Sequence, residues 1–491
     1  MKRSFTKRAA AAALAISMTA SLACVSANAR TLVYKGDYDM DGILTSSDAL
    51  GTLRMSIGLV RKSNAVLDRI DIDNDGLITS NDALTILRDS VDIDKITQSR
   101  SADAPYTVND GMNDFSAQVF KRSYEKGTNT LVSPLSIYTA LAMLENGADN
   151  ETKQEMLQML GGGDNSVESI NEYMKKYIAT INGGGILNTA NSMYIMDRND
   201  VDINSAFTEE IRKDYFAEVF REPANNATVK KINDWVKLNT KDMINKVIEE
   251  DSLTPDKLAL LLNAVSFKAK WSEQYESWDI SKSVFHNYDG TTCETDFLYG
   301  DEYSYISDEL SEGFIKYYDT TIEDEKTGKW RRDEEYAFVA ILPNEGVSVD
   351  DYIAQMNDST IRQLVDSRKY EDCTTIMPKF KYECSFNMSE TLQNMGMKTA
   401  FDKKHADFSK LAESKFGNNV YVNSVIHKTF IELDENGTKA AAVTVVDINC
   451  DTAVAPPEKT IKLDRPFIYV IYDTKNSVPV FIGTVCDLTN K

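Results

Sequence analysis

The pattern of hydrophobic positions repeats near the start of the chain, in two segments 34 residues apart. The repeated positions carry Leu50, Leu53 and Ile57 in the first segment, and Leu84, Leu87 and Val91 in the second. Spacings of three and four residues place each trio on one face of a helix. The pattern therefore predicts two similar short helices, one in each segment.

A different order of elements is predicted after residue 112. Residues 113–124 and 137–145 have a helical pattern, whereas residues 337–342 and 467–472 are short apolar runs typical of buried strands. Helices come first and strands later, which favours an α+β fold over alternating βαβ units. With 491 residues, 42% of them hydrophobic, the chain can form a sizeable core and more than one domain.

The first 29 residues have the pattern of a secretory signal peptide. Lys2, Arg3, Lys7 and Arg8 precede the apolar stretch 9–23, and Ala27-Asn28-Ala29 matches a small-x-small cleavage site. A lipoprotein anchored through Cys24 is the alternative, but the usual Leu three residues upstream is missing. We therefore expect residues 1–29 to be removed and the mature protein to be secreted, with no transmembrane segment, since no other stretch reaches ~18 apolar residues.

Charge and cysteine usage narrow the classes of partner and site. The net charge of −22 argues against nucleic acid and anionic membranes as partners. Only three histidines are present, too few to favour a His-based triad or zinc site. Five cysteines remain after the signal peptide, and their scattered positions argue against a disulfide framework: Cys293, Cys373, Cys384, Cys450 and Cys486.

Each of the two predicted N-terminal helices follows an acidic loop with the calcium-binding pattern D-x-D-x-D-G. Calcium takes hard oxygen ligands, and alternate residues of a tight loop turn inward to supply them. The ligands predicted for the first loop are Asp37, Asp39, Asp41, Ile43 through its carbonyl, Thr45 and Asp48. Those for the second loop are Asp71, Asp73, Asp75, Leu77 through its carbonyl, Thr79 and Asp82. We expect one calcium ion in each loop.

Loop-then-helix, twice, with Asp at the twelfth loop position, resembles a dockerin, a small all-α module with two EF-hand-like calcium loops. The resemblance covers residues 30–96 and implies binding to a cohesin domain of a scaffold protein at a cell-surface cellulosome. The cohesin contacts that it implies are Ser46, Ser47, Arg54, Ser80, Asn81 and Arg88. The polar residues 97–111 are predicted to form a linker.

Residues 112–491 resemble the serpin family of protease inhibitors along nearly their whole length. The segment 129–136 looks like the family motif N-x-x-x-S-P-x-S, and 262–271 looks like the strand that ends in F-K-G-x-W, with Ala269 in place of the usual Gly. Met377-Pro378-Lys379-Phe380 and Asp464-Arg465-Pro466-Phe467 follow in the family's order. The resemblance implies an α+β serpin fold with a large central β-sheet A, two further sheets, about nine helices and an exposed reactive centre loop.

The resemblance also assigns roles to polar residues within apolar runs. Ser133, Ser136, Asn263 and His427 would form the shutter, a hydrogen-bonded cluster beneath the point where the main sheet parts. Trp271 would lie at the breach, the top of that opening. The alternative is that these side chains are satisfied buried polar groups or simple core packing, since an unsatisfied buried group costs about 1–3 kcal/mol.

The segment from Glu435 resembles the serpin hinge, E-x-G-T-E-A-A-A-A-T. The hinge residues are Glu435, Gly437, Thr438, Ala440, Ala441 and Ala442, with Lys439 in place of the usual Glu. The alternate positions Thr438, Ala440, Ala442, Thr444, Val446, Ile448 and Cys450 are all small or apolar, and every charge falls in the other set. This period of two is that of a strand with one core face, so we expect the loop to become a strand.

The reactive bond is left open within a short window. Counting seventeen residues from Glu435, as in inhibitory serpins, gives Asp451, with Thr452 after the cut. Bonds after Cys450, Ala453 or Val454 remain alternatives because the loop looks longer than in many relatives. Asp451 would imply an acid-specific protease, and Ala453 or Val454 an elastase- or subtilisin-like one.

The sequence thus predicts a secreted, scaffold-bound protease inhibitor that acts as a suicide substrate and is not an enzyme. Its partners would be a target protease, either serine or cysteine, and a cohesin. The alternative is a non-inhibitory serpin that serves as a binding or structural module. The small hinge residues argue against it, because a loop that never inserts need not keep them.

Overall fold

The computed structural model divides the chain into two compact units, residues 1–102 and 103–491. In the first unit the structure describes residues 36, 38, 46–57, 59, 70–72 and 77–90. In the second it describes 107–161, 165–183, 186–254, 258–323, 330–333, 335–357, 359–416, 419–438 and 459–489. The predicted signal peptide, residues 97–106 of the predicted linker 97–111 and the reactive loop from Lys439 to Glu458 lie outside the described residues. Residues 108–111 of that linker instead form the start of a helix capped by Thr107.

The described residues of the first unit form two helices of equal length, α2 (Ser46–Ser56) and α4 (Ser80–Ser90). They lie where the hydrophobic repeat predicts helices. Ala49, Ile70 and Ile86 form a small buried core. The repeated apolar trios are not in that core, since their described members are all exposed: Leu50, Leu53, Ile57, Leu84 and Leu87.

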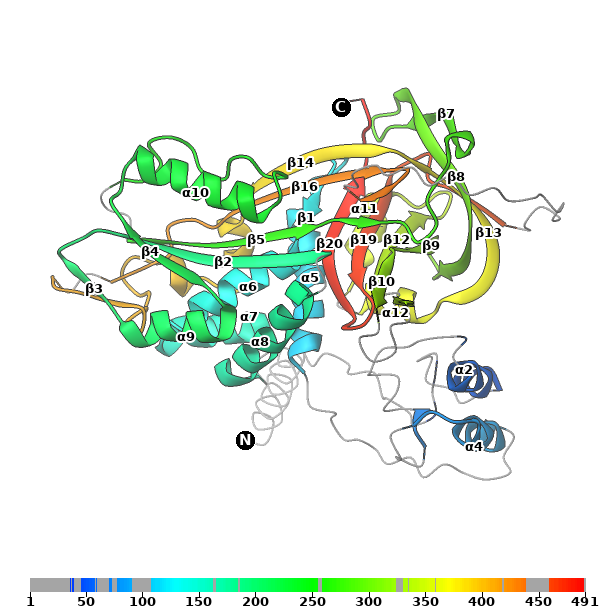
Figure 1. Ribbon diagram of the computed structural model, residues 1–491, viewed down its shortest axis with the longest axis horizontal. Coiled ribbons are helices and arrows are strands. Elements are labelled where there is room, and N and C mark those ends of the chain that lie inside the picture. The colour runs from blue at the N-terminus through cyan, green and yellow to red at the C-terminus, as the bar shows by residue number, and fades with distance from the viewer. Residues whose placement is uncertain are drawn as a thin grey trace, which may run out of the picture. The chain divides into compact units, whose positions relative to one another are not determined.

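Helices of the second unit are concentrated in its first half (Figure 1). Local sequence signals set their starts: Thr107 and Asp110 form a capping box, and Ser133 caps the helix that begins with Pro134. The helices are α5 (Val108–Ser123), α6 (Pro134–Glu145), α7 (Asn150–Gly161), α8 (Val167–Gly183), α9 (Ser205–Tyr215), α10 (Asn226–Asn239), α11 (Val349–Gln355), α12 (Thr360–Asp366) and α13 (Ser389–Asn394), with 3-10 turns η1 (Ser277–Asp279) and η2 (Thr399–Phe401).

One large sheet pairs continuously in the order β1-β20-β19-β12-β9-β8-β13-β18, with β7 also on β8. Its strands are β1 (Leu131–Val132), β7 (Ile280–His286), β8 (Thr292–Ser307), β9 (Ser311–Tyr317), β12 (Tyr336–Pro343), β13 (Lys369–Pro378), β18 (Lys459–Lys462), β19 (Phe467–Asp473) and β20 (Val478–Val485). The two further sheets expected from the sequence are joined here, because the sixteen-residue β8 pairs with β9 near one end and with β7 along the other.

The second large sheet is split into two halves. One half has the order β4-β2-β5 and the other β14-β16-β17-β6. Their strands are β2 (Leu187–Met196), β4 (Glu218–Glu222), β5 (Ala259–Phe267), β6 (Ala269–Lys270), β14 (Phe380–Asn387), β16 (Ile426–Asp434) and β17 (Gly437–Thr438). Two small sheets pair β3 (Val201–Ile203) with β15 (Ala412–Ser414), and β10 (Thr320–Glu323) with β11 (Trp330–Asp333).

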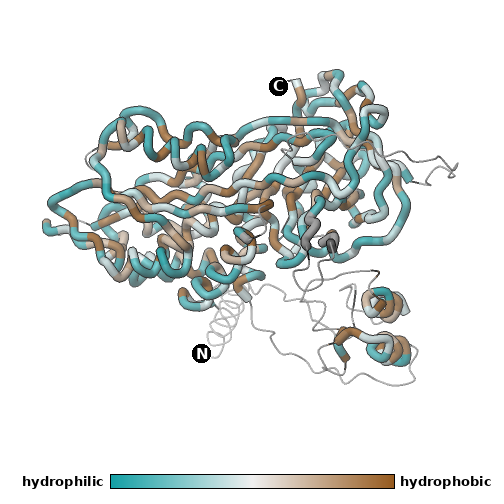
Figure 2. Tube along the Cα trace, viewed as in Figure 1, coloured by the Kyte–Doolittle hydropathy of each residue, from teal (hydrophilic) through white to brown (hydrophobic). Residues whose placement is uncertain are grey.

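The main core lies between the helices and the two sheets, and α6 contacts both β5 of the split sheet and β20 of the continuous one. A second cluster lies on the other face of β5, where α10 packs over Leu262 and Ala264. Figure 2 shows the hydrophobic positions gathered along the strands and the hydrophilic ones on the outer turns. Strand β5 is therefore covered on both faces.

Candidate functional site

The site begins at β17, which lies between β16 and β6, and β6 follows β5 of the other half of the split sheet after one residue. Gly437 and Thr438 pair antiparallel with Asp434 and Leu433 of β16, and with Lys270 and Ala269 of β6. Gly437 has φ +147, and a Cβ there would lie 2.1 Å from the Ala269 carbonyl oxygen. Only glycine fits this position, so the close approach of three strands depends on it.

Thr438 points into the core. It is 4% exposed, and its hydroxyl lies 2.6 Å from the hydroxyl of Tyr318. Tyr318 is itself buried and stacks on Trp271, with ring centroids 4.6 Å apart. The first inward-facing side chain of the predicted hinge is therefore buried and hydrogen-bonded.

Trp271 and its neighbours hold the chain that leads into β17. The Trp271 indole N–H donates to the Asp434 carbonyl at 2.9 Å, and its backbone N–H donates to the Asn436 carbonyl at 2.9 Å. Glu435 forms an ion pair with Lys379 at 2.6 Å. These contacts hold residues 434–436 in place, just ahead of the segment predicted to form the reactive loop.

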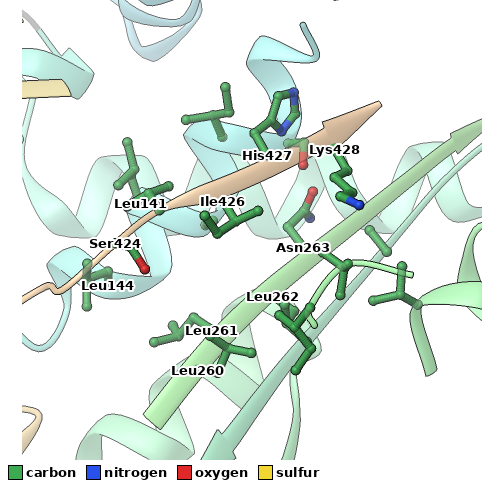
Figure 3. A pocket seen from close by; sticks show the side chains of 18 of the residues that line it. Leu141, Leu144, Leu260, Leu261, Leu262, Asn263, Ser424, Ile426, His427 and Lys428 are labelled. Carbon is green, nitrogen blue, oxygen red and sulfur yellow. The ribbon is translucent and has the colours of Figure 1, made fainter. Parts of the chain in front are cut away.

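Beyond β17 the two halves of the sheet separate. Strands β5 and β16 belong to different sheets, and a cavity of about 790 Å³ lies between them. Figure 3 shows Asn263 on β5 and Lys428 on β16 reaching into the space between the strands. The facing edges of β5 and β16 thus form a slot that continues the line of β17.

Polar groups occupy the floor of the slot. The Ser133 backbone N–H donates to His427 Nε2 at 3.0 Å, and the Ser133 hydroxyl donates to the Val480 carbonyl at 2.9 Å. The Ser136 backbone N–H donates to the Ser133 hydroxyl at 3.3 Å. Burial lowers the pKa of His427 to about 4, so the imidazole is neutral and its Nε2 can accept.

Asn263 lines the same slot but bonds to other partners. Its amide donates to the Thr189 hydroxyl at 2.7 Å and to Asn191 Oδ1 at 2.8 Å, both on β2. Among the described residues, its own buried Oδ1 has no hydrogen-bond partner. The structure therefore brings Ser133, Ser136 and His427 into one network and places Asn263 across the slot from it.

The model of one known family matches residues 110–488: Serpin (serine protease inhibitor). The chain belongs to the serpin family. The same region is similar to curated serpins from distant organisms. An uncharacterised serpin-like protein of Thermococcus kodakarensis is 28% identical over 76% of this chain and 84% of its own length. Iripin-2 of Ixodes ricinus is 28% identical over 73% and 87%.

Solved serpin structures share the fold. The native state of the thermophilic serpin tengpin is 39% identical and has a TM-score of 0.70, covering 77% of this chain and 94% of that one. Its latent state is 38% identical with a TM-score of 0.67. The family and the serpin fold expected from the motifs are confirmed, and as a member of a family of protease inhibitors this serpin is not an enzyme.

Several residues predicted for the reactive loop of this serpin lie outside the described residues. They are Ala440, Ala441, Ala442, Cys450, Asp451, Thr452, Ala453 and Val454. Their roles stay predictions, as do the breach and shutter roles. Sequence reasoning missed Tyr318 and Thr189, which bond Thr438 and Asn263, because no motif links a strand residue to a partner across the fold.

In the first unit, the described parts of the two acidic loops match each other. Asp48 Oδ1 accepts from the Tyr38 backbone N–H and Asp82 Oδ1 from the Ile72 backbone N–H, both at 2.8 Å. Each bond joins the twelfth loop position to the second. Asp71, Leu77 and Thr79 are also described, whereas the other predicted ligands are not: Asp37, Asp39, Asp41, Ile43, Thr45, Asp73 and Asp75.

The predicted cohesin contacts are all exposed on or beside α2 and α4: Ser46, Ser47, Arg54, Ser80, Asn81 and Arg88. Within the described parts of the chain there is no cluster of three or more metal-ligating acidic, His or Cys side chains. In those same parts, no helix has the length and apolar character needed to cross a bilayer.

Proposed function

We propose that this serpin inhibits its target as a suicide substrate. The observation that carries the proposal is the two-residue strand β17, seated between β16 and β6 at the head of an open slot. A loop that follows β17 can extend it into a full strand once cleavage frees its far end. Among the described strands, none pairs with the slot-facing edges of β5 and β16 below β17, so an inserted strand could pair with both edges and stabilise the cleaved form.

Continuing the observed register predicts the contacts of the inserted strand. Since Thr438 pairs with Leu433 and Ala269, Ala440 would lie opposite Ile431 and Phe267, both buried. Four residues further along the inserted strand, Thr444 would face the same side as Ala440 and lie opposite His427 and Asn263. Its hydroxyl can donate to the unpartnered Asn263 Oδ1. The small inward residues of the loop suit this face.

The chemical step belongs to the protease. Its nucleophile would attack the carbonyl carbon of Asp451, form an acyl bond there, and release the amine of Thr452 as the peptide C–N bond breaks. Insertion of the freed hinge would then carry the acylated protease away before water hydrolyses the ester (serine protease) or thioester (cysteine protease). Cys450, Ala453 and Val454 remain alternative bait residues, and a serine or cysteine protease is the target class.

The experiment is direct. The full chain is mixed with a panel of acid-specific, elastase-like and subtilisin-like proteases, and the products are separated under denaturing conditions. We expect a covalent complex with at least one protease and a released peptide that begins at Thr452. Cleavage of the loop by every protease with no complex would overturn the proposal and favour the non-inhibitory alternative.

We further propose that residues 30–96 form a dockerin that binds two calcium ions and a cohesin. The proposal is supported by the two matching loop closures and by helices that follow both loops. The hard oxygen donors predicted at alternate positions suit calcium. Calorimetric titration of the full chain should reveal two calcium sites, and Asp73→Ala should remove one while leaving the other. A titration without any binding would exclude the dockerin.

Secretion and attachment to a cellulosome-like scaffold follow from the same proposal. The signal-peptide pattern in residues 1–29 and the six exposed residues at α2 and α4 support it. Calcium-dependent capture of the full chain by an immobilised cohesin is the expected result. Arg54→Glu with Arg88→Glu should abolish capture but leave protease inhibition unchanged. Capture that persists in chelator would contradict a calcium-built interface.

A further inference from the structure

Two tyrosines stack on the outside of the continuous sheet, close to the strand that receives the end of the reactive loop. Tyr303 of β8 and Tyr370 of β13 lie with ring centroids 5.7 Å apart and an interplanar angle of 14°. They are 47% and 76% exposed. Most aromatic side chains of this unit are buried, so a stacked pair left in water is a candidate contact for another protein.

Carboxylates surround this pair. Asp372, Asp301 and Glu273 are exposed and near enough to raise the pKa of Tyr303, with Asp372 contributing most. Glu371 is paired with Lys459 at 3.3 Å. The strand β13 shifts its register against β8 between Tyr370 and Cys373, and such a bulge re-aims side chains. The surface offers flat aromatic rings within a negative rim.

The sheet topology places the tyrosine pair near the start of β18, the strand that follows the predicted reactive loop. β18 pairs in parallel with β13, and Lys459 lies opposite Cys373. Because the strands are parallel, Lys459, the first residue of β18, lies toward the end of β13 that carries Tyr370. Asp451 precedes Lys459 by eight residues, which span at most about 29 Å when extended. A protease domain of roughly 230 residues has a radius of gyration of about 17 Å. A protease held on the loop therefore comes within reach of this end of the sheet.

We infer that Tyr303, Tyr370, Asp301 and Asp372 form a docking surface for the attacking protease, which selects proteases with a basic rim around their active site. The inference rests on the proposed inhibitory function and adds a partner class to it. Tyrosine rings give contact area at low entropic cost, and the carboxylates speed the encounter with a cationic partner. The loop sequence would then determine which bond is cut, and the docking surface would determine which proteases bind rapidly.

The test separates surface recognition from loop recognition. Asp451→Arg gives the loop a bond that trypsin attacks, and trypsin exists in cationic and anionic forms of the same specificity. Tyr370→Ala and Asp372→Lys are made in this background. The matched control is Phe416→Ala, since Phe416 is also 76% exposed but follows β15, away from β8, β13 and β18. The second-order rate constant of inhibition and its salt dependence are measured, with the stoichiometry and the unfolding midpoint.

We expect each variant to slow inhibition of cationic trypsin about tenfold, with a weaker salt dependence for Asp372→Lys and an unchanged stoichiometry. Anionic trypsin should respond less than about twofold to Tyr370→Ala, and Phe416→Ala should change neither. Equal effects on both trypsins, or none, would overturn the docking surface while inhibition itself stands. Absence of any covalent complex in the Asp451→Arg parent would instead count against the proposed function.

Discussion

The two large sheets of this serpin differ in how completely their strands are paired. In the continuous sheet, β12, β19 and β20 pair on both sides and every residue in them is buried. In the split sheet, β5 and β16 each have an edge facing the slot that pairs with no other described strand below β17. In the proposed mechanism, the continuous sheet keeps its pairing throughout, whereas the split sheet pairs with the inserted loop. In this account, the continuous sheet acts as a scaffold, and the split sheet carries out the proposed insertion.

The largest effect should come from placing a charge on the inward face of the hinge. Ala440→Glu would put a carboxylate opposite Ile431 and Phe267 during insertion, at a cost of several kcal/mol. The protein should change from inhibitor to substrate, with at least a tenfold rise in the stoichiometry of inhibition. The matched control is Lys439→Glu, whose side chain would face the partly exposed Glu432 and Lys268. Equal behaviour of the two variants would show that the register is wrong.

A cavity in the continuous sheet should change stability without changing the outcome of inhibition. Ile341 of β12 is fully buried, and Ile341→Ala should lower the unfolding free energy by about 2–5 kcal/mol. The stoichiometry of inhibition by the remaining folded protein should stay that of the parent, because no contact of the inserting strand is altered. Denaturant unfolding and complex formation measure the two quantities. A raised stoichiometry would mean that this sheet takes part in insertion.

Acid should loosen the floor of the slot. The folded-state pKa of His427, about 4, lies below its ordinary 6.5, so between these values the unfolded chain takes up the proton first. The contribution of neutral His427 to the free energy of unfolding is complete above about pH 6.5. It falls by up to about 3 kcal/mol as the pH drops toward 4. His427→Gln keeps an acceptor for the Ser133 N–H and should remove that part of the pH dependence. Unchanged pH profiles in the variant would exclude His427 as the titrating group.

The smallest effect concerns the head of the slot. Tyr318→Phe removes the hydroxyl bonded to Thr438 and should cost about 1 kcal/mol of native-state stability. Thr438→Val should cost a similar amount, and the double variant should cost less than the sum, because both remove one bond. Thermal unfolding of the four proteins gives the coupling. Strict additivity would mean that the two hydroxyls do not stabilise each other.

The local pattern of hydrophobic residues predicts the helices and strands well, but it does not predict which segments pack or pair with each other. The helix expected at 137–145 is α6, and the strands expected at 337–342 and 467–472 are β12 and β19. The period of two in the hinge agrees with the inward position of Thr438. The slot itself could not be predicted, since an unpaired strand edge depends on contacts between β5 and β16, some 160 residues apart in the chain.

Periodic spacing in the sequence also predicts which side chains share one face of a strand or helix. It does not predict whether solvent or other residues cover that face. The alternation in the sequence predicts that the side chains of both Lys439 and Ala441 face solvent. In the continued register Ala441 would lie opposite Ser266, which is buried on the side of β5 that α10 covers. The same limit applies to the N-terminal leucines, whose helical spacing predicts a common face. That face is exposed because Ala49 and Ile86 fill the small core instead.

Amide hydrogen exchange before and after cleavage of the loop tests the central claim most directly. In the intact protein, backbone amides of β5 and β16 that face the slot should exchange quickly, while those of β12 and β19 are protected. After the loop is cut, the slot-facing amides should slow by orders of magnitude, because the inserted strand pairs with both edges, and β12 and β19 should stay as they were. Fast exchange in β5 and β16 that persists after cleavage would contradict insertion into the slot.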